Sequence, residues 1–139
     1  MRDADLRQIL TETKTIAVLG FSAKPDRPSH YVAAFLQARG YRVVPVNPGL
    51  AGQVVLGETV YADLAEIPRE IAIDMVDVFR TPEAVPAIVA EIAAQRPEVK
   101  TLWLQLGVVH EEAAAEARAA GLVVVMDRCP KIDIPRLGL

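Results

Sequence analysis

The sequence predicts an α/β fold in which a parallel sheet carries helices on both of its faces. Apolar runs typical of strands alternate with amphipathic stretches typical of helices along the whole chain. The apolar runs are continuous, which is the pattern of strands buried on both faces. With 139 residues and no linker, repeat or low-complexity tract, residues 1–139 are expected to form a single domain.

Two strands and two helices are expected in the first third of the chain. They are a short surface helix over 3–13, a strand over 16–19, a helix over 29–39 and a strand over 42–46. Gly40 provides the C-cap of the second helix. Residues 50–70 are mixed, and we expect a loop, an extended piece at 59–61 and a helical turn at 63–65.

The second half continues the alternation. The expected elements are a strand over 71–79, a helix to about residue 95, a strand over 101–106, a helix over 111–120 and a strand over 122–126. Thr81 and Pro82 supply an N-cap and a first-turn proline for the third helix, and Pro86 leaves its exact start open. Five strands are therefore expected.

Composition and charge exclude several classes of protein. The net charge of −3 argues against a general nucleic-acid or membrane-surface protein. No apolar run reaches the roughly 18 residues of a membrane span, and the charged N-terminus is not a signal peptide. The single cysteine, Cys129, excludes an internal disulfide framework and argues against a structural zinc site. We expect a cytoplasmic setting.

The stretch from 15 to 29 predicts an anion site. A strand ends at Gly20, a loop carries Lys24 and Arg27, and a helix opens at Pro28–Ser29. Loop amides and the free N–H groups of a helix N-terminus converge above such a strand. We expect a phosphorylated ligand to bind there. The alternative is that Lys24 and Arg27 belong to a solvated loop.

Two more cations follow later strands. Arg80 follows the third and Arg128 the fifth, so four cations are expected along the ligand-binding edge of the sheet. Arg80 also precedes a helix N-terminus, where a cation costs up to about 1 kcal/mol that a bound anion would offset. The alternatives are that Arg80 pairs with Asp77 or points to water.

The glycine pattern disfavours NAD without excluding it. A dinucleotide fingerprint needs G-x-G-x-x-G and an acidic residue after the second strand. This chain has Gly20, but Ser22 stands at the second glycine position and Asn47 ends the second strand. A neutral turn tolerates a phosphorylated ribose better than a carboxylate would.

Six blocks of sequence resemble the small stand-alone CoA-binding proteins, which are similar to the N-terminal CoA-binding domain of the succinyl-CoA synthetase alpha subunit. The blocks are IAVLGFS at 16–22, RPS at 27–29, GYRVVPVNP at 40–48, VDVFR at 76–80, WLQLGV at 103–108 and AGLVVVMDRCP at 120–130. The resemblance covers nearly the whole chain. It implies a Rossmann-type, doubly wound fold with coenzyme A as the ligand, and it does not carry over the ligase activity, whose phosphorylated histidine lies in a second synthetase domain.

The resemblance also implies a set of binding residues. The loop from Phe21 to Lys24 would hold the CoA phosphates, and the corners at 47–48, 79–81 and 105–107 would line the adenosine and pantetheine path. The synthetase domain has a lysine where this chain has Leu50, so a nearby cation would have to supply that charge. The expected binding residues are Gly20, Phe21, Ser22, Ala23, Lys24, Arg27, Pro28, Ser29, Asn47, Pro48, Phe79, Arg80, Thr81, Gln105 and Gly107.

Other candidate groups point to no active site. His110 is expected as a helix-start or ligand contact, His30 in a first helical turn and Trp103 in the core. Asp74 and Asp77 lie three apart on a strand and so face opposite sides.

Cys129 follows the fifth strand beside Arg128, which could lower the pKa of the thiol. It could form a mixed disulfide with CoA or accept an acyl group, although a packed small side chain is the commoner case. We therefore expect a protein that binds CoA or an acyl-CoA without catalysis and has no nucleic-acid or membrane partner. The alternative is an NAD(P)-binding protein, or an acyl-CoA-dependent enzyme or redox sensor that uses Cys129.

Overall fold

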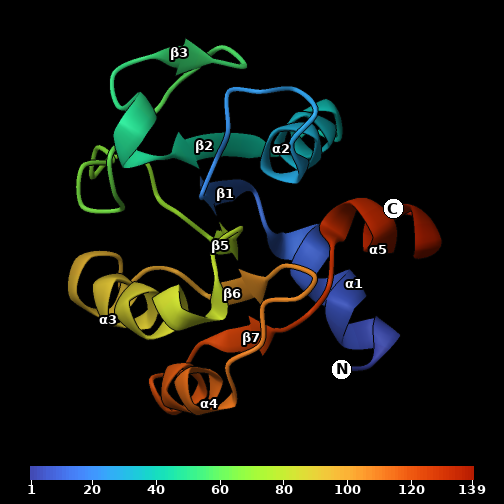
Figure 1. Ribbon diagram of the computed structural model, residues 1–139. Helices are drawn as coiled ribbons and strands as arrows, with labels where there is room; N and C mark the ends of the chain where they lie inside the picture. Colours follow the sequence, from blue (N-terminus) through green and yellow to red (C-terminus); the bar gives the residue numbers. More distant parts are fainter.

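The computed structural model describes residues 1–139 and contains a five-stranded, wholly parallel sheet (Figure 1). The strand order is β2-β1-β5-β6-β7, so the chain winds in one direction from β1 to β2 and in the other from β5 onward. This is the predicted doubly wound, Rossmann-type arrangement, and its order reverses between β1 and β5. The strands are β1 Thr15–Leu19, β2 Arg42–Val46, β5 Met75–Val78, β6 Thr101–Leu104 and β7 Val123–Val125.

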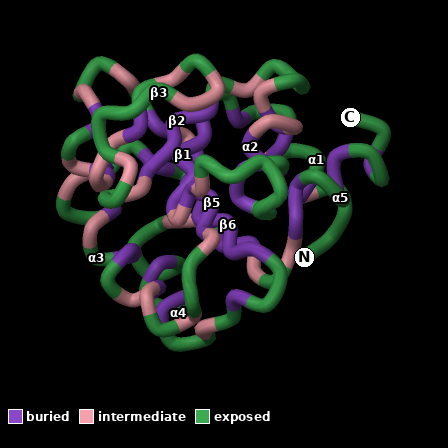
Figure 2. Tube along the Cα trace, turned by 45° about the horizontal axis from the view of Figure 1, so that its top comes forward, coloured by how far each residue is buried: buried purple, intermediate pink, exposed green.

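Helices cover both faces of the sheet, as predicted. α3 (Val85–Gln95) and α4 (Glu111–Ala119) lie on one face, over alternate strand residues such as Ala17 and Leu19. Helices α1 (Asp3–Glu12), α2 (Pro28–Ala38) and α5 (Pro130–Arg136) lie on the other. The strands run through the buried interior and the connections lie outside (Figure 2). Burial on both faces explains why the strands read as continuous apolar runs.

The segment after β2 agrees with the expectation in part, because Thr59 and Tyr61 are extended as expected at 59–61. It contains an antiparallel hairpin of β3 (Val54–Val55) and β4 (Glu58–Thr59), while residues 63–65 form turns and no helix. Both turn residues of the hairpin, Leu56 and Gly57, have positive φ, the backbone signature of a tight two-residue turn. The Leu-Gly pair is an unusual carrier of this turn, which is why the hairpin was not predicted.

The third strand is shorter than predicted. β5 begins at Met75 instead of Ile71. At Asp74, just before it, the side-chain carboxylate accepts from the N–H groups of Lys14 (3.1 Å) and Thr15 (3.0 Å) and so ties this end of β5 to the start of β1. The helix after it also begins later. Pro82–Ala84 form a short 3-10 turn, and Pro86 lies in the first turn of α3, where its missing N–H leaves no acceptor unsatisfied.

Helix α5 was not predicted at all. It has seven residues, begins with Pro130 and contains Pro135, so it gives neither a clear period nor the composition of a helix. Its place comes from tertiary packing, because Ile134 is buried and Arg136 pairs with Asp3 of α1 at 3.0 Å. These contacts fix the position of α5, which forms one wall of the candidate ligand-binding cleft.

The side chain of Arg96 holds the irregular segment 64–71, which leads into β5. Its side chain is 1% exposed and donates to the carbonyl oxygens of Leu64 (3.0 Å), Ile71 (3.2 Å) and Pro68 (3.3 Å). The segment 64–71 has no regular secondary structure, so this buried guanidinium satisfies carbonyls that no helix or strand would pair. No helix of the structure has the length and apolar character needed to cross a membrane.

Candidate ligand-binding cleft

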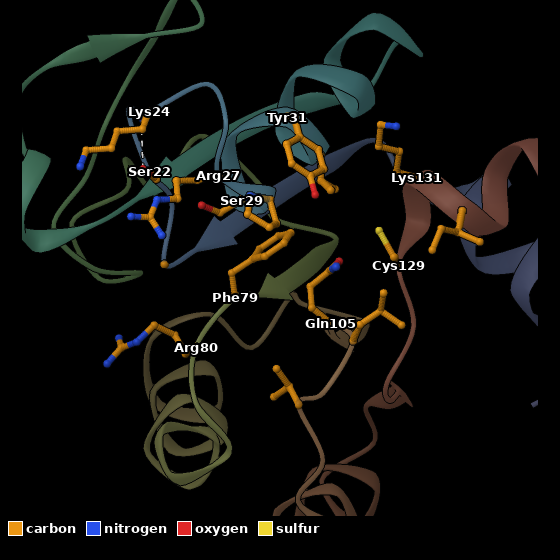
Figure 3. A pocket seen from close by; sticks show the side chains of 16 residues that line it. Ser22, Lys24, Arg27, Ser29, Tyr31, Phe79, Arg80, Gln105, Cys129 and Lys131 are labelled. Carbon is orange, nitrogen blue, oxygen red and sulfur yellow. Dashed lines mark hydrogen bonds between the residues drawn. The ribbon is translucent and has the colours of Figure 1, made fainter.

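A cleft of about 810 Å³ opens at the carboxyl end of the sheet, beside the point where the strand order reverses (Figure 3). Segments that follow β1, β5, β6 and β7 meet there, together with the start of α2 and the start of α5. The lining residues are Gly20, Ser22, Lys24, Arg27, Pro28, Ser29, Tyr31, Val32, Phe79, Arg80, Gln105, Leu106, Val108, Cys129, Lys131 and Ile132.

Hydrogen bonds with β2, with the turn after β2 and with α2 fix the loop after β1. The N–H groups of Gly20 and Phe21 both donate to the carbonyl oxygen of Val46 at 3.2 Å. The carbonyl of Phe21 accepts from Asn47 Nδ2 at 2.7 Å. The next carbonyl, that of Ser22, accepts from His30 Nδ1 at 2.8 Å. These hydrogen bonds fix the backbone of the loop and with it the direction of its remaining N–H groups.

Three of these N–H groups have no acceptor in the protein. They belong to Ser22 and Ala23 in the loop and to Ser29 in the first turn of α2. Unpaired N–H groups of a loop and a helix N-terminus form a site for an anion. The anion site predicted for 15–29 therefore has the backbone it requires.

The charge of the cleft is one-sided. Four of its lining residues are cations, Lys24, Arg27, Arg80 and Lys131, and none is acidic. None of the four takes part in an ion pair within the protein. A protein with a net charge of −3 thus gathers unpaired positive charge around one cavity.

Most of the binding residues predicted from the sequence come together in this cleft. Asn47 and Pro48 instead line a neighbouring cavity of about 590 Å³, the side cavity, which shares Gly20 and Arg80 with the cleft. The predicted residues in the cleft itself are Gly20, Ser22, Lys24, Arg27, Pro28, Ser29, Phe79, Arg80 and Gln105.

The remaining predicted residues do not line either cavity. Phe21 is buried and stacks on the ring of His30, while Ala23 and Thr81 are exposed. Gly107 is turned to the neighbouring loop, where its N–H donates to Asp127 Oδ1 at 2.7 Å. Ala23, in the loop beside the cleft, has an N–H group without an acceptor in the protein.

Arg128 was expected as the fourth cation and does not line the cleft. Its guanidinium pairs with the buried carboxylate of Asp133 at 3.1 Å, and Arg136 pairs with the same carboxylate. Lys131, on the first turn of α5, takes its place, with Nζ 5.8 Å from the centroid of the Tyr31 ring. Because α5 was not predicted, Lys131 could not be expected at the cleft from local sequence signals.

The other lining residues outside the predicted binding set come from several parts of the chain. Tyr31 and Val32 come from α2, Val108 from the loop after β6 and Ile132 from α5. Leu106 lies in a predicted corner, and for Cys129 the sequence predicts either a reactive thiol or a packed side chain. Helical periodicity in α2 assigns Val32 to the core, and nothing local shows that its neighbour Tyr31 reaches the mouth of a cleft.

Asp77 has no cation beside it, so the suggested pair with Arg80 does not form. Asp77 is 0% exposed, and neither of its carboxylate oxygens has a hydrogen-bond partner. Burial without a compensating charge raises the pKa of Asp77 well above its ordinary value of 3.8. Arg80 is exposed and forms no hydrogen bond within the protein, so it is available to a ligand.

The remaining candidates have structural roles. Trp103 is buried and donates from Nε1 to the carbonyl of Arg128 at 2.8 Å. His110 caps α4, because its Nδ1 accepts from the N–H of Ala113 at 3.0 Å. His30 lies in the first turn of α2, as expected, and holds the loop after β1.

Comparison with known proteins identifies the family of this chain. Residues 14–135 match a family described as a CoA binding domain. YneT of Bacillus subtilis (strain 168) is 38% identical over 129 residues, which cover 93% of this chain and 91% of YneT. A solved structure from Thermus thermophilus, cell-free ID.343, is 41% identical, with a TM-score of 0.91 over 99% of both chains. A hypothetical protein from Pyrococcus horikoshii OT3 is 35% identical, with a TM-score of 0.91 over 100% of this chain and 94% of its own. The chain belongs to the CoA binding domain family.

Proposed function

We propose that the protein binds coenzyme A, or an acyl ester of it, in the cleft, and holds it without catalysing its conversion. The observation that carries this proposal is the gathering of four unpaired cations, with no carboxylate, around one cavity of an acidic protein. Phosphate groups are the anions of CoA, and cations together with free N–H groups are their usual protein partners.

The loop after β1 fits the diphosphate. The free N–H groups of Ser22 and Ser29 and the side chains of Lys24 and Arg27 lie at the same end of the cleft, and the free N–H of Ala23 belongs to the same loop. Two successive phosphates need several donors at once, and this loop offers both backbone and charged donors. A lone cation could not provide such a set.

The side cavity fits the adenosine. It adjoins the cleft at Gly20 and Arg80 and lies beyond the end of β2, beside Asn47. It is lined by Asp63 and Glu91, which are suited to hydroxyl and amino groups and not to phosphate. Arg80 lies between the two cavities and so can reach a phosphate from either side.

The far end of the cleft fits the pantetheine arm. Leu106, Val108 and Ile132 give it an apolar wall, and Gln105 places an amide among them. Pantetheine is a flexible apolar chain interrupted by amides, so this mixture of groups matches it. No histidine or carboxylate, the commonest general acids and bases, lines the cleft.

Titration calorimetry with CoA, NAD and NADP tests the proposal. We expect heat of binding with CoA and a weaker or absent signal with NAD and NADP. Arg27→Ala should weaken CoA binding about tenfold or more, because a charged hydrogen bond to phosphate is lost. Arg7→Ala removes the same charge from α1, away from the cleft, and should bind as the wild type does. No heat with CoA at high micromolar concentration would overturn the proposal.

Incubation with acetyl-CoA tests the absence of catalysis. We expect no sustained release of free CoA above the rate in buffer when the mixture is followed by chromatography. Release of many equivalents of CoA per protein would show turnover and contradict this part of the proposal.

A further inference from the structure

Cys129 is the single cysteine of the chain, and its side chain lines the cleft while being only 7% exposed. It follows β7, at the opposite end of the cleft from Lys24 and Arg27 (Figure 3). The thiol is therefore shielded from bulk solvent and faces the space proposed for the pantetheine arm. A ligand seated in the cleft would reach it more readily than a reagent in solution would.

The backbone brings Cys129 beside Gln105. The N–H of Arg128 donates to the carbonyl oxygen of Leu104 at 3.2 Å, which pairs the chain after β7 with the chain after β6. The next residue on each side is Cys129 and Gln105, and both side chains line the cleft. A backbone hydrogen bond just beyond the end of β7 thus brings the two side chains together (Figure 3).

Gln105 carries a free acceptor at this point. Its side chain is 5% exposed, and its Oε1 has no hydrogen-bond partner in the protein. A buried amide oxygen without a partner costs free energy that a ligand N–H would recover. The terminal amide of pantetheine offers such an N–H, and only two carbon atoms separate that nitrogen from the sulfur. A hydrogen bond from this amide to Gln105 would bring the sulfur to the side chain of Cys129.

We propose that Cys129 captures bound coenzyme A as a mixed disulfide, and that Gln105 positions the pantetheine sulfur for this step. The inference rests on the proposed function and deepens it. The co-reactant is a disulfide form of CoA, such as its mixed disulfide with glutathione. The thiolate of Cys129 attacks the pantetheine sulfur, the old S–S bond breaks and a new S–S bond joins Cys129 to CoA. Glutathione leaves as the thiolate and takes up the proton that Cys129 released, so no further oxidant is needed.

The captured state persists in this protein. A resolving cysteine is absent because Cys129 is the only one in the chain. Release therefore requires an external thiol to attack the mixed disulfide. The cleft would hold CoA covalently under oxidising conditions and reversibly under reducing ones.

Intact-mass spectrometry of the reduced protein tests the inference. The protein is incubated with the CoA–glutathione mixed disulfide or, separately, with oxidised glutathione at equal concentration. We expect one CoA adduct per chain, formed about tenfold or more faster than any glutathione adduct, because the cleft holds the reacting sulfur in place. Dithiothreitol should remove the adduct, and Cys129→Ser should not form it. Equal rates with both disulfides would overturn the inference, since they would indicate a thiol that reacts without recognition.

Calorimetry separates this inference from the proposed function. Titration of the wild-type protein with reduced CoA in buffer containing dithiothreitol measures binding without capture, and a thermal melt confirms that Cys129→Ser, used in the mass-spectrometric test, is folded. Binding of reduced CoA together with no adduct from the CoA–glutathione disulfide would overturn the inference alone, whereas absence of CoA binding would overturn the proposed function and the inference with it.

Gln105→Met has nearly the same volume and no amide oxygen. It should slow CoA adduct formation about fivefold, through loss of one hydrogen bond, and leave the reaction with oxidised glutathione unchanged. An unchanged CoA rate in this variant would contradict the role of Gln105.

Discussion

A β-carbon placed on Gly20 would lie 2.2 Å from the carbonyl oxygen of Phe79. Gly20 follows β1 with φ of +80°, and Phe79 follows β5, so the backbone segments just beyond these two neighbouring strands are in close contact. The contact places Arg80 where the cleft and the side cavity meet. The lack of a side chain at Gly20 therefore decides the shape of the proposed ligand site.

Gly20→Ala is expected to destabilise the fold and weaken ligand binding together. Positive φ costs about 1 kcal/mol for a residue with a side chain, and displacing the Phe79 backbone raises the total to about 3 kcal/mol. Gly52→Ala is the matched control, because Gly52 has φ of +88° and nothing within 4 Å of its added β-carbon. Urea denaturation should show a loss of only about 1 kcal/mol in Gly52→Ala, the cost of positive φ. Equal losses in both variants would show that the contact with Phe79 is unimportant.

Arg80→Ala should weaken CoA binding about 10- to 100-fold, the range for a charged hydrogen bond to phosphate. Stability of the free protein should be unchanged or slightly higher, since Arg80 has no partner in the protein and stands just before a helical segment. Calorimetry with CoA and dephospho-CoA locates the contact. A larger loss for CoA assigns Arg80 to the 3′-phosphate, and equal losses assign it to the diphosphate. No loss with either ligand would remove Arg80 from the site.

Asp77→Asn should flatten the dependence of stability on pH. The unfolded chain releases the proton near the ordinary pKa of 3.8, and burial holds the folded pKa well above that value. Between these two pKa values the folded state binds more protons, so its free energy of unfolding falls as pH rises, by about 1.4 kcal/mol per pH unit.

Urea denaturation at pH 4, 5 and 6 measures this difference. The stability advantage of Asp77→Asn over the wild type should grow with pH across the series. Asp26→Asn, which changes an exposed carboxylate in the loop after β1, should keep the wild-type profile. A constant difference between wild type and Asp77→Asn would contradict the burial of an uncompensated carboxyl group.

Arg96→Ala should destabilise the protein by about 3–5 kcal/mol, because it leaves several carbonyls of the segment 64–71 without a donor. Arg96→Lys should recover only part of this loss, since an ammonium cannot reproduce the planar fork of donors. Arg118→Ala, which changes an exposed side chain of α4, is the control and should change stability by less than about 0.5 kcal/mol. A loss of similar size in Arg118→Ala would contradict the special role of Arg96.

The strands and the longer helices could be predicted because their signals are local. The apolar run of β1 and the bounds of β2 follow from a few neighbouring residues, and so does the loop that carries Lys24 and Arg27. The short hairpin at 54–59 and α5 could not be predicted, because their stability comes from packing against distant parts of the chain. Propensity is a weak guide where tertiary contacts are the main source of stability.

The cationic half of the cleft could likewise be predicted from the order of strands and charges. Parallel strands place their carboxyl ends at one edge, which brings Arg80 to the loop after β1 even though many residues separate them. The opposite wall could not be predicted. Arg128 forms an ion pair with Asp133 and does not line the cleft, and α5 places Lys131 and Ile132 there instead.

The sequence by itself determined the alternation of strands and helices, the family to which the chain is similar and the positive charge near the end of β1. Only the tertiary structure decided that Asp77 is buried without a partner, that Arg96 supports the return to β5 and that Cys129 lies beside Gln105 in the cleft. Periodicity and charge are properties of neighbouring residues, whereas burial and hydrogen-bond partners depend on segments far apart in the chain.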